Sequence, residues 1–416
     1  MKILQLPSYY FPEHAASSYL GDNIRESLCK DGCIVELYAP TPCRGISKEE
    51  RKRYQHITKE TAFDGNLIVN RFPLLAEGKN PVLRAFRYFL CCCKHYYYGV
   101  RAKDIDVMFL ASTPPIQGAL GALLKKRKKV PLVYNLQDIF PDSLAGTGLA
   151  KRDGLLWKIG RVIEDFTYRN ADKIVVISED FKKNIMTKGV PEDKIEVIYN
   201  WVDEQAVVDI PREDNKLFDK YGLDRGKFYI EYSGNIGLTQ NMDLLLDVMK
   251  ELQVEYPEIQ LVLVGEGAYK KNVEAIIERD CLENVHMFPF QPYEDISYVF
   301  SLGDVGLVIS KPGVGANSVP SKTWSILSAS RPVLANFDEN ELKDIVKDNN
   351  CGIFTKAGDK DAFKQAILDL YSNREKCKEY GRNGRAFIMA NLTRAVGTQK
   401  YVDVIMSVVA QSEQKK

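Results

Sequence analysis

The sequence of 416 residues has few of the side chains that build metal centres and disulfide frameworks. It contains four His, which show no ligand spacing, and nine Cys, an odd number without a pair of CxxC motifs. Structural zinc sites and disulfide frameworks need such spacings, so we expect neither, and we expect no bound metal. A reducing cytoplasm is the compartment that fits this use of cysteine.

The sequence also lacks an excess of charge of one sign. Its 57 Lys and Arg residues oppose 56 Asp and Glu residues, for a formal net charge of +1. This balance argues against a dedicated nucleic-acid binder. With 45% hydrophobic and 27% charged residues the chain has an ordinary globular composition, and its length predicts two or three domains.

Long apolar runs are missing as well. The first residues show no basic segment followed by a long apolar one, so we expect no signal peptide and a cytoplasmic protein. The longest stretch without a charge, residues 107–124, contains the adjacent Pro114 and Pro115, which would break a membrane-spanning helix. We predict a strand, a turn and a helix there instead.

Short apolar runs typical of β-strands are abundant in the first half. Most are continuous rather than alternating, as expected for parallel strands that are covered on both faces. Helical patterns separate several of them, for example at residues 19–30 and 155–170, which predicts an α/β doubly wound domain. The predicted strands are residues 2–6, 34–38, 67–72, 107–111, 132–136, 173–177 and 195–199.

A second β/α series follows a polar stretch at residues 201–227, which we interpret as a linker with a short helix. We therefore predict an N-terminal Rossmann-like domain at 1–205, a C-terminal Rossmann-like domain at 206–390, and a helix within 391–416 that returns toward the first domain, with a frayed end from 411. The predicted strands of the second series are residues 228–233, 260–264, 285–288, 305–309, 333–336 and 352–355, and its last helices are 360–372, 375–391 and 398–410.

A Gly-rich turn follows the first strand of the second series. The segment Ser233-Gly234-Asn235-Ile236-Gly237 leads into a predicted helix at 242–253. A strand that ends in such a turn aims backbone N–H groups and the positive end of the helix at one point, which suits a phosphate. A tight connection that needs Gly for a positive φ accounts for the turn equally well.

Two further loops follow neighbouring strands. Val264-Gly265-Glu266-Gly267 ends the second strand, and Pro289-Phe290-Gln291-Pro292 follows the third. Open α/β sheets bind ligands at the carboxyl ends of their strands, so three such loops favour a ligand site more than one does.

Together with five more motifs, these loops resemble a known family over nearly the whole chain. The further motifs are residues 304–310, Val319-Pro320-Ser321-Lys322 and Arg331-Pro332-Val333 in the second half, and residues 9–17 and 136–143 in the first. The pattern resembles retaining GT-B glycosyltransferases of the group 1 and family 4 type, in a branch with Pro-Ser-Lys that builds bacterial capsules, exopolysaccharides and O-antigens. The resemblance implies two Rossmann-like domains that face each other across a cleft.

The resemblance also implies roles for individual residues. Lys322 would stabilise the departing diphosphate and Asp138 would orient the acceptor, although a solvated Lys and a turn-capping Asp are the ordinary alternatives. No nucleophile of the enzyme is apparent; paired carboxylates of the glycosidase type are conceivable, but the resemblance implies an internal-return route. The implied donor-binding residues are Gly234, Asn235, Gly237, Glu266, Phe290, Ser318, Ser321 and Lys322, and the acceptor-binding residues are Glu13, His14, Ala16 and Ser17.

Several positions depart from the family pattern, and at the first Gly turn the usual basic pair is replaced by Asn235 and by Thr239 or Gln240. Asn317 and Ser325 replace two glutamates that are usual near the donor sugar and ribose, and Gln137 stands where a His is common. These departures motivate one alternative, a catalytically inactive partner subunit. A GT-B sugar-nucleotide epimerase is the other, but the donor loops have few of the His and Glu residues that it would need.

The expected reaction is metal-independent transfer of a hexose or N-acetylaminosugar from a nucleotide-sugar to a polyprenyl-diphosphate-linked glycan, in cell-surface polysaccharide biosynthesis. UDP-sugars are favoured over GDP-sugars, and no cofactor is expected. Asp104-Ile105-Asp106 has the DxD spelling of metal-binding glycosyltransferases. It precedes a strand, however, so its carboxylates are expected at the wrong edge of the sheet for a ligand.

Charge is unevenly distributed along the chain. Residues 1–205 carry +6 and residues 206–416 carry −5, and the stretch from Lys79 to Lys129 alone carries +9, interleaved with aromatic residues. This mixture is typical of segments that lie on an anionic bilayer, each basic residue contributing at most about 1 kcal/mol. We hypothesise a peripheral contact with the inner face of the cell membrane, with a basic end of a helix on a soluble domain as the alternative and nucleic acid as a poorer one.

Overall fold

A computed structural model describes the chain except for residues 14–17, 79, 144–150, 152–153, 316–318 and 415–416. Its contacts divide the chain into two compact units. Unit 1 comprises Met1–Tyr199 and Gly397–Lys416, and unit 2 comprises Asn200–Val396. Among the residues predicted to have a function, Lys79, His14, Ala16, Ser17, Asn317 and Ser318 lie outside the described residues.

Unit 1 is built on a sheet with the strand order β3-β4-β2-β1-β5-β6-β7-β8. Neighbouring strands are parallel except at the β3 edge, where β3 runs antiparallel to β4. The apolar runs that predicted strands fall on this sheet, because parallel strands are buried on both faces. The strands are β1 (Lys2–Gln5), β2 (Ile34–Pro40), β3 (Lys59–Ala62), β4 (Leu67–Phe72), β5 (Val107–Ala111), β6 (Leu132–Leu136), β7 (Lys173–Val176) and β8 (Ile195–Val197).

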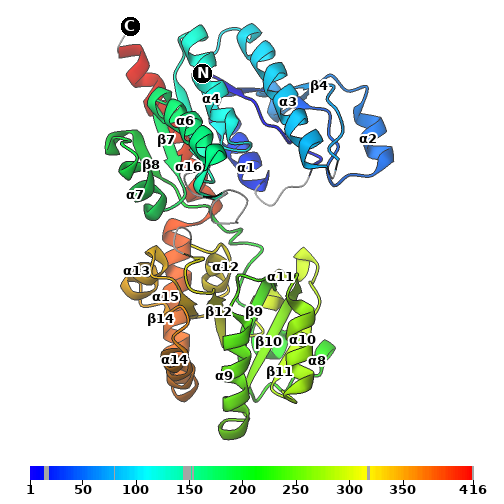
Figure 1. Ribbon diagram of the computed structural model, residues 1–416, viewed down its shortest axis with the longest axis vertical. Helices are drawn as coiled ribbons and strands as arrows, with labels where there is room; N and C mark the ends of the chain where they lie inside the picture. Colours follow the sequence, from blue (N-terminus) through cyan, green and yellow to red (C-terminus); the bar gives the residue numbers. More distant parts are fainter. Residues whose placement is uncertain (14–17, 79, 144–150, 152–153, 316–318, 415–416) are drawn as a thin grey trace. The chain divides into compact units, whose positions relative to one another are not determined.

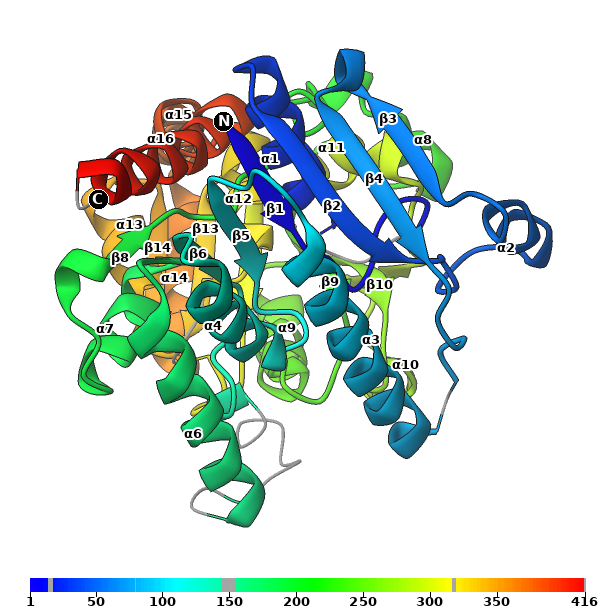
Figure 2. The ribbon, with the colours of Figure 1, turned by 90° about the horizontal axis from the view of Figure 1, so that it is seen from above.

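Helices connect the parallel strands of unit 1, and α3, α4 and α6 lie side by side (Figure 2). The last helix of the chain, α16 (Arg394–Gln414), begins in unit 2 and continues in unit 1, where the Tyr401 hydroxyl bonds the Asn135 side chain of β6. The other helices are α1 (Ser18–Lys30), α2 (Lys48–Tyr54), α3 (Pro81–Arg101), α4 (Ile116–Lys128), α6 (Leu155–Asn170) and α7 (Glu179–Thr187).

Unit 2 carries a second sheet with the strand order β11-β10-β9-β12-β13-β14, and its neighbouring strands are parallel (Figure 1). Its strands are β9 (Phe228–Asn235), β10 (Ile259–Glu266), β11 (Val285–Phe288), β12 (Val305–Ile309), β13 (Val333–Phe337) and β14 (Gly352–Lys356). Its helices are α8 (Lys216–Tyr221), α9 (Met242–Glu255), α10 (Lys270–Arg279), α11 (Ile296–Phe300), α12 (Lys322–Ser328), α13 (Glu341–Asp348), α14 (Lys360–Ser372) and α15 (Arg374–Asn391).

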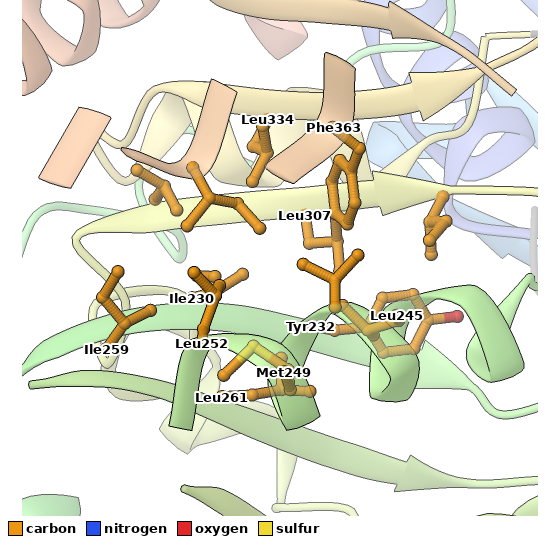
Figure 3. Close-up of a cluster of buried hydrophobic side chains, with 14 of the residues drawn as sticks. Ile230, Tyr232, Leu245, Met249, Leu252, Ile259, Leu261, Leu307, Leu334 and Phe363 are labelled. Atoms are coloured by element: carbon orange, nitrogen blue, oxygen red, sulfur yellow. The ribbon is translucent and has the colours of Figure 1, made fainter. Parts of the chain in front are cut away.

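The two faces of the unit 2 sheet are covered by different helices. On one face, Leu245 and Met249 of α9 and Phe363 of α14 form a core with Ile230 and Leu307 of the strands (Figure 3). The opposite face is covered by α8 and α11, whose side chains cluster with Tyr229, and by α12, whose Ile326 lies against Gly306. Because side chains alternate along a strand, Glu231 of β9 points to this second face.

Most predicted elements are confirmed, including the strand, turn and helix predicted at residues 107–124, where the helix continues to Lys128, and three details differ. The polar strand β3 had no apolar pattern to reveal it. The stretch interpreted as a linker is partly ordered in unit 2, because Leu217 and Phe218 of α8 are fully buried. The end predicted to fray is helical through Gln414.

Candidate functional site

The Gly-rich turn lies where β9 meets β10, and its glycines are required by close backbone contacts. Gly234 has a φ of 137°, which favours glycine. A Cβ on Gly265 would lie 1.9 Å from the carbonyl oxygen of Gly234, and one on Gly267 would lie 2.2 Å from that of Ile236. The two loops predicted from separate motifs therefore form one surface at the carboxyl end of the sheet.

The backbone N–H groups of this turn are partly used within the protein. The N–H of Ile236 donates to the Glu266 carbonyl at 2.8 Å, and the N–H of Gly237 donates to the side-chain oxygen of Gln240 at 3.0 Å. A diphosphate that binds the Gly237 N–H must therefore displace Gln240. The sequence did not predict that Gln240 accepts the Gly237 N–H and so competes with a diphosphate.

The sheet opens beside this turn. The β9–β10 ladder continues to Asn235 opposite Glu266, whereas the described pairing of β9 with β12 ends with Glu231 opposite Gly306. The order of the strands also reverses between β9 and β12, and such a switch point is the place where open α/β sheets bind ligands. The last residues of β9 are thus left without a strand partner on the β12 side.

Lys322, the first residue of α12, reaches into this opening. Its Nζ lies 3.4 Å from the centre of the Tyr232 ring, and a Cβ on Gly234 would be only 3.1 Å from the same atom. The residue is partly exposed, but its ammonium end is turned inward. Among the described residues no carboxylate lies within ion-pair distance of it. Burial lowers the pKa of Lys322 to about 7, against the opposing effect of Glu231.

Glu231 lies at the base of the same opening. It is 1% exposed, and neither of its carboxylate oxygens has a hydrogen-bond partner of good geometry among the described residues. Burial raises the pKa of Glu231 to about 8, while the nearby Ser233 hydroxyl and the Lys322 ammonium lower it in part. A buried acid without a partner is unusual enough to indicate a function. The single acid in an otherwise apolar strand was the sequence signal that could have revealed it.

The other predicted donor residues are more exposed. Glu266 ends β10, and its carboxylate pairs with Lys270 at 2.7 Å. Phe290 is 57% exposed in the loop after β11, and Ser321 is exposed immediately before α12. The structure thus brings Lys322 against Gly234, which lies in the same turn as Gly237.

The predicted acceptor residues lie in unit 1. Glu13 is buried, and one of its carboxylate oxygens accepts the backbone N–H groups of Cys43 and Arg44 at 2.8 and 2.9 Å. Asp138 is exposed after β6, at the edge of a small hollow that also includes Glu164 and Tyr168. At the opposite edge of the sheet, Asp106 accepts the backbone N–H of Lys2.

Comparison with protein families assigns both halves of the chain. Residues 22–206 match the model of glycosyltransferase family 4, and residues 213–387 match that of glycosyl transferases group 1. The chain is a GT-B glycosyltransferase. The predicted group 1 and family 4 type and the predicted α/β GT-B fold are therefore confirmed, and the site at the Gly234 turn lies in the half that matches glycosyl transferases group 1.

Individual relatives of this GT-B glycosyltransferase are distant. WbjE of Pseudomonas aeruginosa, named a probable glycosyltransferase, is 24% identical over 350 residues, which is 83% of this chain and 84% of WbjE. WcaI of Escherichia coli (strain K12), assigned to colanic acid biosynthesis, is 28% identical over 50% of this chain and 51% of its own length.

Solved structures share the fold. Alr3699/HepE of Anabaena in complex with UDP has a TM-score of 0.72 at 17% identity, covering 98% of this chain and 100% of that protein. The same Anabaena protein in complex with UDP-glucose has a TM-score of 0.69 at 17% identity and the same coverage.

Proposed function

We propose that this GT-B glycosyltransferase transfers a sugar from a UDP-sugar, with retention of anomeric configuration and without a metal, to a lipid-linked glycan in cell-surface polysaccharide biosynthesis. Similar proteins support the UDP-sugar donor and the role in polysaccharide biosynthesis. Alr3699/HepE was solved with UDP and with UDP-glucose, and WcaI is assigned to colanic acid biosynthesis.

One observation carries the proposal for the donor site, namely the position of Lys322. Its ammonium lies beside Gly234 without a carboxylate partner among the described residues, at the switch point of a parallel sheet. A diphosphate at the turn would supply the missing negative charge. During transfer the leaving diphosphate gains negative charge, and a preorganised cation at this point stabilises that charge in a site shielded from water.

A thermal-shift panel with UDP, GDP, CDP and UDP-sugars tests the proposal. We expect UDP and a UDP-sugar to raise the melting temperature, because a ligand at about 100 times its Kd adds about 2.7 kcal/mol to the stability of the protein that binds it. No shift with any nucleotide would overturn the donor site. Binding of a UDP-sugar with neither hydrolysis nor transfer would instead indicate the inactive partner subunit.

The membrane contact that we propose for the acceptor involves two helices of unit 1. Leu83, Phe86 and Phe89 of α3 are exposed, and α6 exposes an apolar stripe made of Leu155, Leu156, Ile159 and Val162. Helices that connect parallel strands run opposite to them, so the first turns of α3 and α6 lie at the carboxyl edge of the sheet. The exposed basic residues Arg84, Lys151 and Lys158 accompany these apolar side chains. This combination suits an anionic bilayer.

The basic run at the end of α4 is a weaker candidate for the membrane contact than its sequence indicates. Lys125 pairs with Asp172 at 2.6 Å, and Lys128 donates to the Ala102 carbonyl. By the same reasoning on helix direction, the end of α4 lies at the amino edge, away from the apolar stripe of α6. No helix in the described part of the chain is both long enough and apolar enough to cross a bilayer.

Co-sedimentation with phosphatidylglycerol vesicles separates the two surfaces. The variant L156S/I159S is expected to bind roughly tenfold more weakly, since each exposed Leu or Ile contributes about 1.5–3 kcal/mol when fully buried and less when it enters a bilayer partly. The matched variant K126Q/R127Q, on α4, should change binding less. Unchanged binding of L156S/I159S would contradict a contact through α6.

A further inference from the structure

The residues that the sheet places directly beside Glu231 are apolar or glycine, and the Ser233 hydroxyl lies near its carboxyl. Val262 of β10 and Gly306 of β12 pair with Glu231 in the sheet, and a Cβ on Gly303 would lie 2.6 Å from the Cβ of Glu231. Any larger residue at 303 would therefore collide with the glutamate. Among the described residues, the titratable groups that interact with this carboxyl are the Lys322 ammonium and the Tyr232 phenol, whose own hydroxyl donates to the Asn235 carbonyl.

An ionised carboxylate without partners is costly in such surroundings, whereas a protonated carboxyl is tolerated. The same argument applies to the Lys322 ammonium, which burial favours as a neutral amine. The pKa of each group therefore lies near neutral pH, and the charge of each group shifts the pKa of the other. Nothing in the chemistry of the turn itself needs a carboxylate, because a carboxylate repels a diphosphate.

We propose that Glu231 is a positioning residue for Lys322: the buried carboxyl acts on the ammonium beside Gly234 through its charge, without a direct contact, so that a nucleoside diphosphate binds at the turn together with protons that both groups take up from solvent. The anionic ligand favours the charged form of Lys322 and the neutral form of Glu231. Both changes require protonation. This inference rests on the donor site proposed above.

Calorimetry of UDP binding in buffers with different ionisation enthalpies measures the linked protons. For the wild type we expect net proton uptake that grows between about pH 7 and about pH 9. The isosteric variant E231Q removes one of two proton-accepting groups, so uptake should fall by about half while UDP still binds. Equal uptake in the wild type and E231Q, or none in the wild type, would overturn the inference.

A measurement without nucleotide tests the carboxyl directly and distinguishes failure of this inference from failure of the donor site. The pKa of Glu231 is raised to about 8 in the folded protein, above its ordinary value, so its contribution to stability is lost as pH rises toward that value. E231Q lacks this loss. Its melting temperature relative to the wild type should therefore increase steadily from about pH 5 to about pH 8.

Glu258 supplies the matched control. It is an exposed acid of unit 2 that pairs with Lys227 at 2.9 Å, away from the turn. The variant E258Q should show a constant offset in melting temperature across this range and an unchanged proton uptake. If E231Q also shows only a constant offset, the carboxyl has a purely structural role and the inference is wrong, whether or not UDP binds.

Discussion

Each unit has its own doubly wound sheet, but the side chains at the switch point are neutral in unit 1 and ionisable in unit 2. In unit 1 the strand order reverses between β1 and β5, and Gln117 of α4 bonds the Leu6 carbonyl just beyond β1. His95 contacts Gln117 at 3.2 Å and the Tyr38 carbonyl at 3.0 Å. Burial lowers the pKa of His95 to about 4, so this cluster is neutral and satisfied at physiological pH.

In unit 2 the corresponding place holds two ionisable groups: Glu231, whose carboxylate oxygens have no hydrogen-bond partner of good geometry among the described residues, and Lys322, whose ammonium lies over the Tyr232 ring. A satisfied neutral cluster contributes to stability, whereas unsatisfied charges cost stability and are retained where a ligand completes them. The same architecture can therefore fill its switch point with neutral, hydrogen-bonded side chains or place ionisable side chains there that can bind an anion. The difference arises from the helix that follows the switch-point strand: α4 after β5 supplies Gln117, whereas α12 after β12 supplies Lys322.

The largest expected effect is a loss of stability when the hydrogen-bonded cluster at the unit 1 switch point is disrupted. Q117A in unit 1 removes a buried side chain and leaves the Leu6 carbonyl without its partner, which should cost about 3 kcal/mol of folding free energy. Chemical denaturation measures this loss. The affinity of the remaining folded protein for UDP should be unchanged, and a loss of UDP affinity would mean that the unit 1 cluster also serves the donor.

The opposite result is expected from K322M in unit 2. Contacts to a charged group contribute about 1.5–3 kcal/mol, so UDP should bind about 10- to 100-fold more weakly. The melting temperature without ligand should hardly fall, because no ion pair is lost. K343M, which removes a partly exposed lysine paired with Glu339 at 2.8 Å, is the matched control for titration calorimetry. Equal UDP affinity of K322M and K343M would contradict the role of Lys322.

The smallest effect should follow from Q240A at the Gly-rich turn. This change frees the Gly237 N–H from its internal acceptor, so a diphosphate no longer competes with Gln240. One neutral hydrogen bond is worth about 1 kcal/mol net, and we expect UDP to bind up to about fivefold more tightly. Weaker binding of UDP to Q240A would show that Gln240 contacts the nucleotide itself.

Much of the fold was predictable because parallel strands are buried on both faces and therefore appear as continuous apolar runs. The strands at Leu67–Phe72 and Val285–Phe288 were predicted with their observed bounds. The edge strand at Lys59–Ala62 was missed, because it is polar and mostly exposed and needs only its pairing with β4 to form.

By itself the sequence determined the family, the two sheets and the Gly-rich turn, since these depend on local patterns of apolar residues and glycines. Only the tertiary structure decided that Lys322 meets Gly234 and that Glu231 lies buried beside them. Those contacts join residues about 90 positions apart in the chain, and they arise because β9 and β12 are neighbours that separate at their carboxyl ends. In unit 1 the direction of the connecting helices, which run opposite to the parallel strands, puts the basic end of α4 at the amino edge of the sheet and the apolar stripe of α6 at the carboxyl edge.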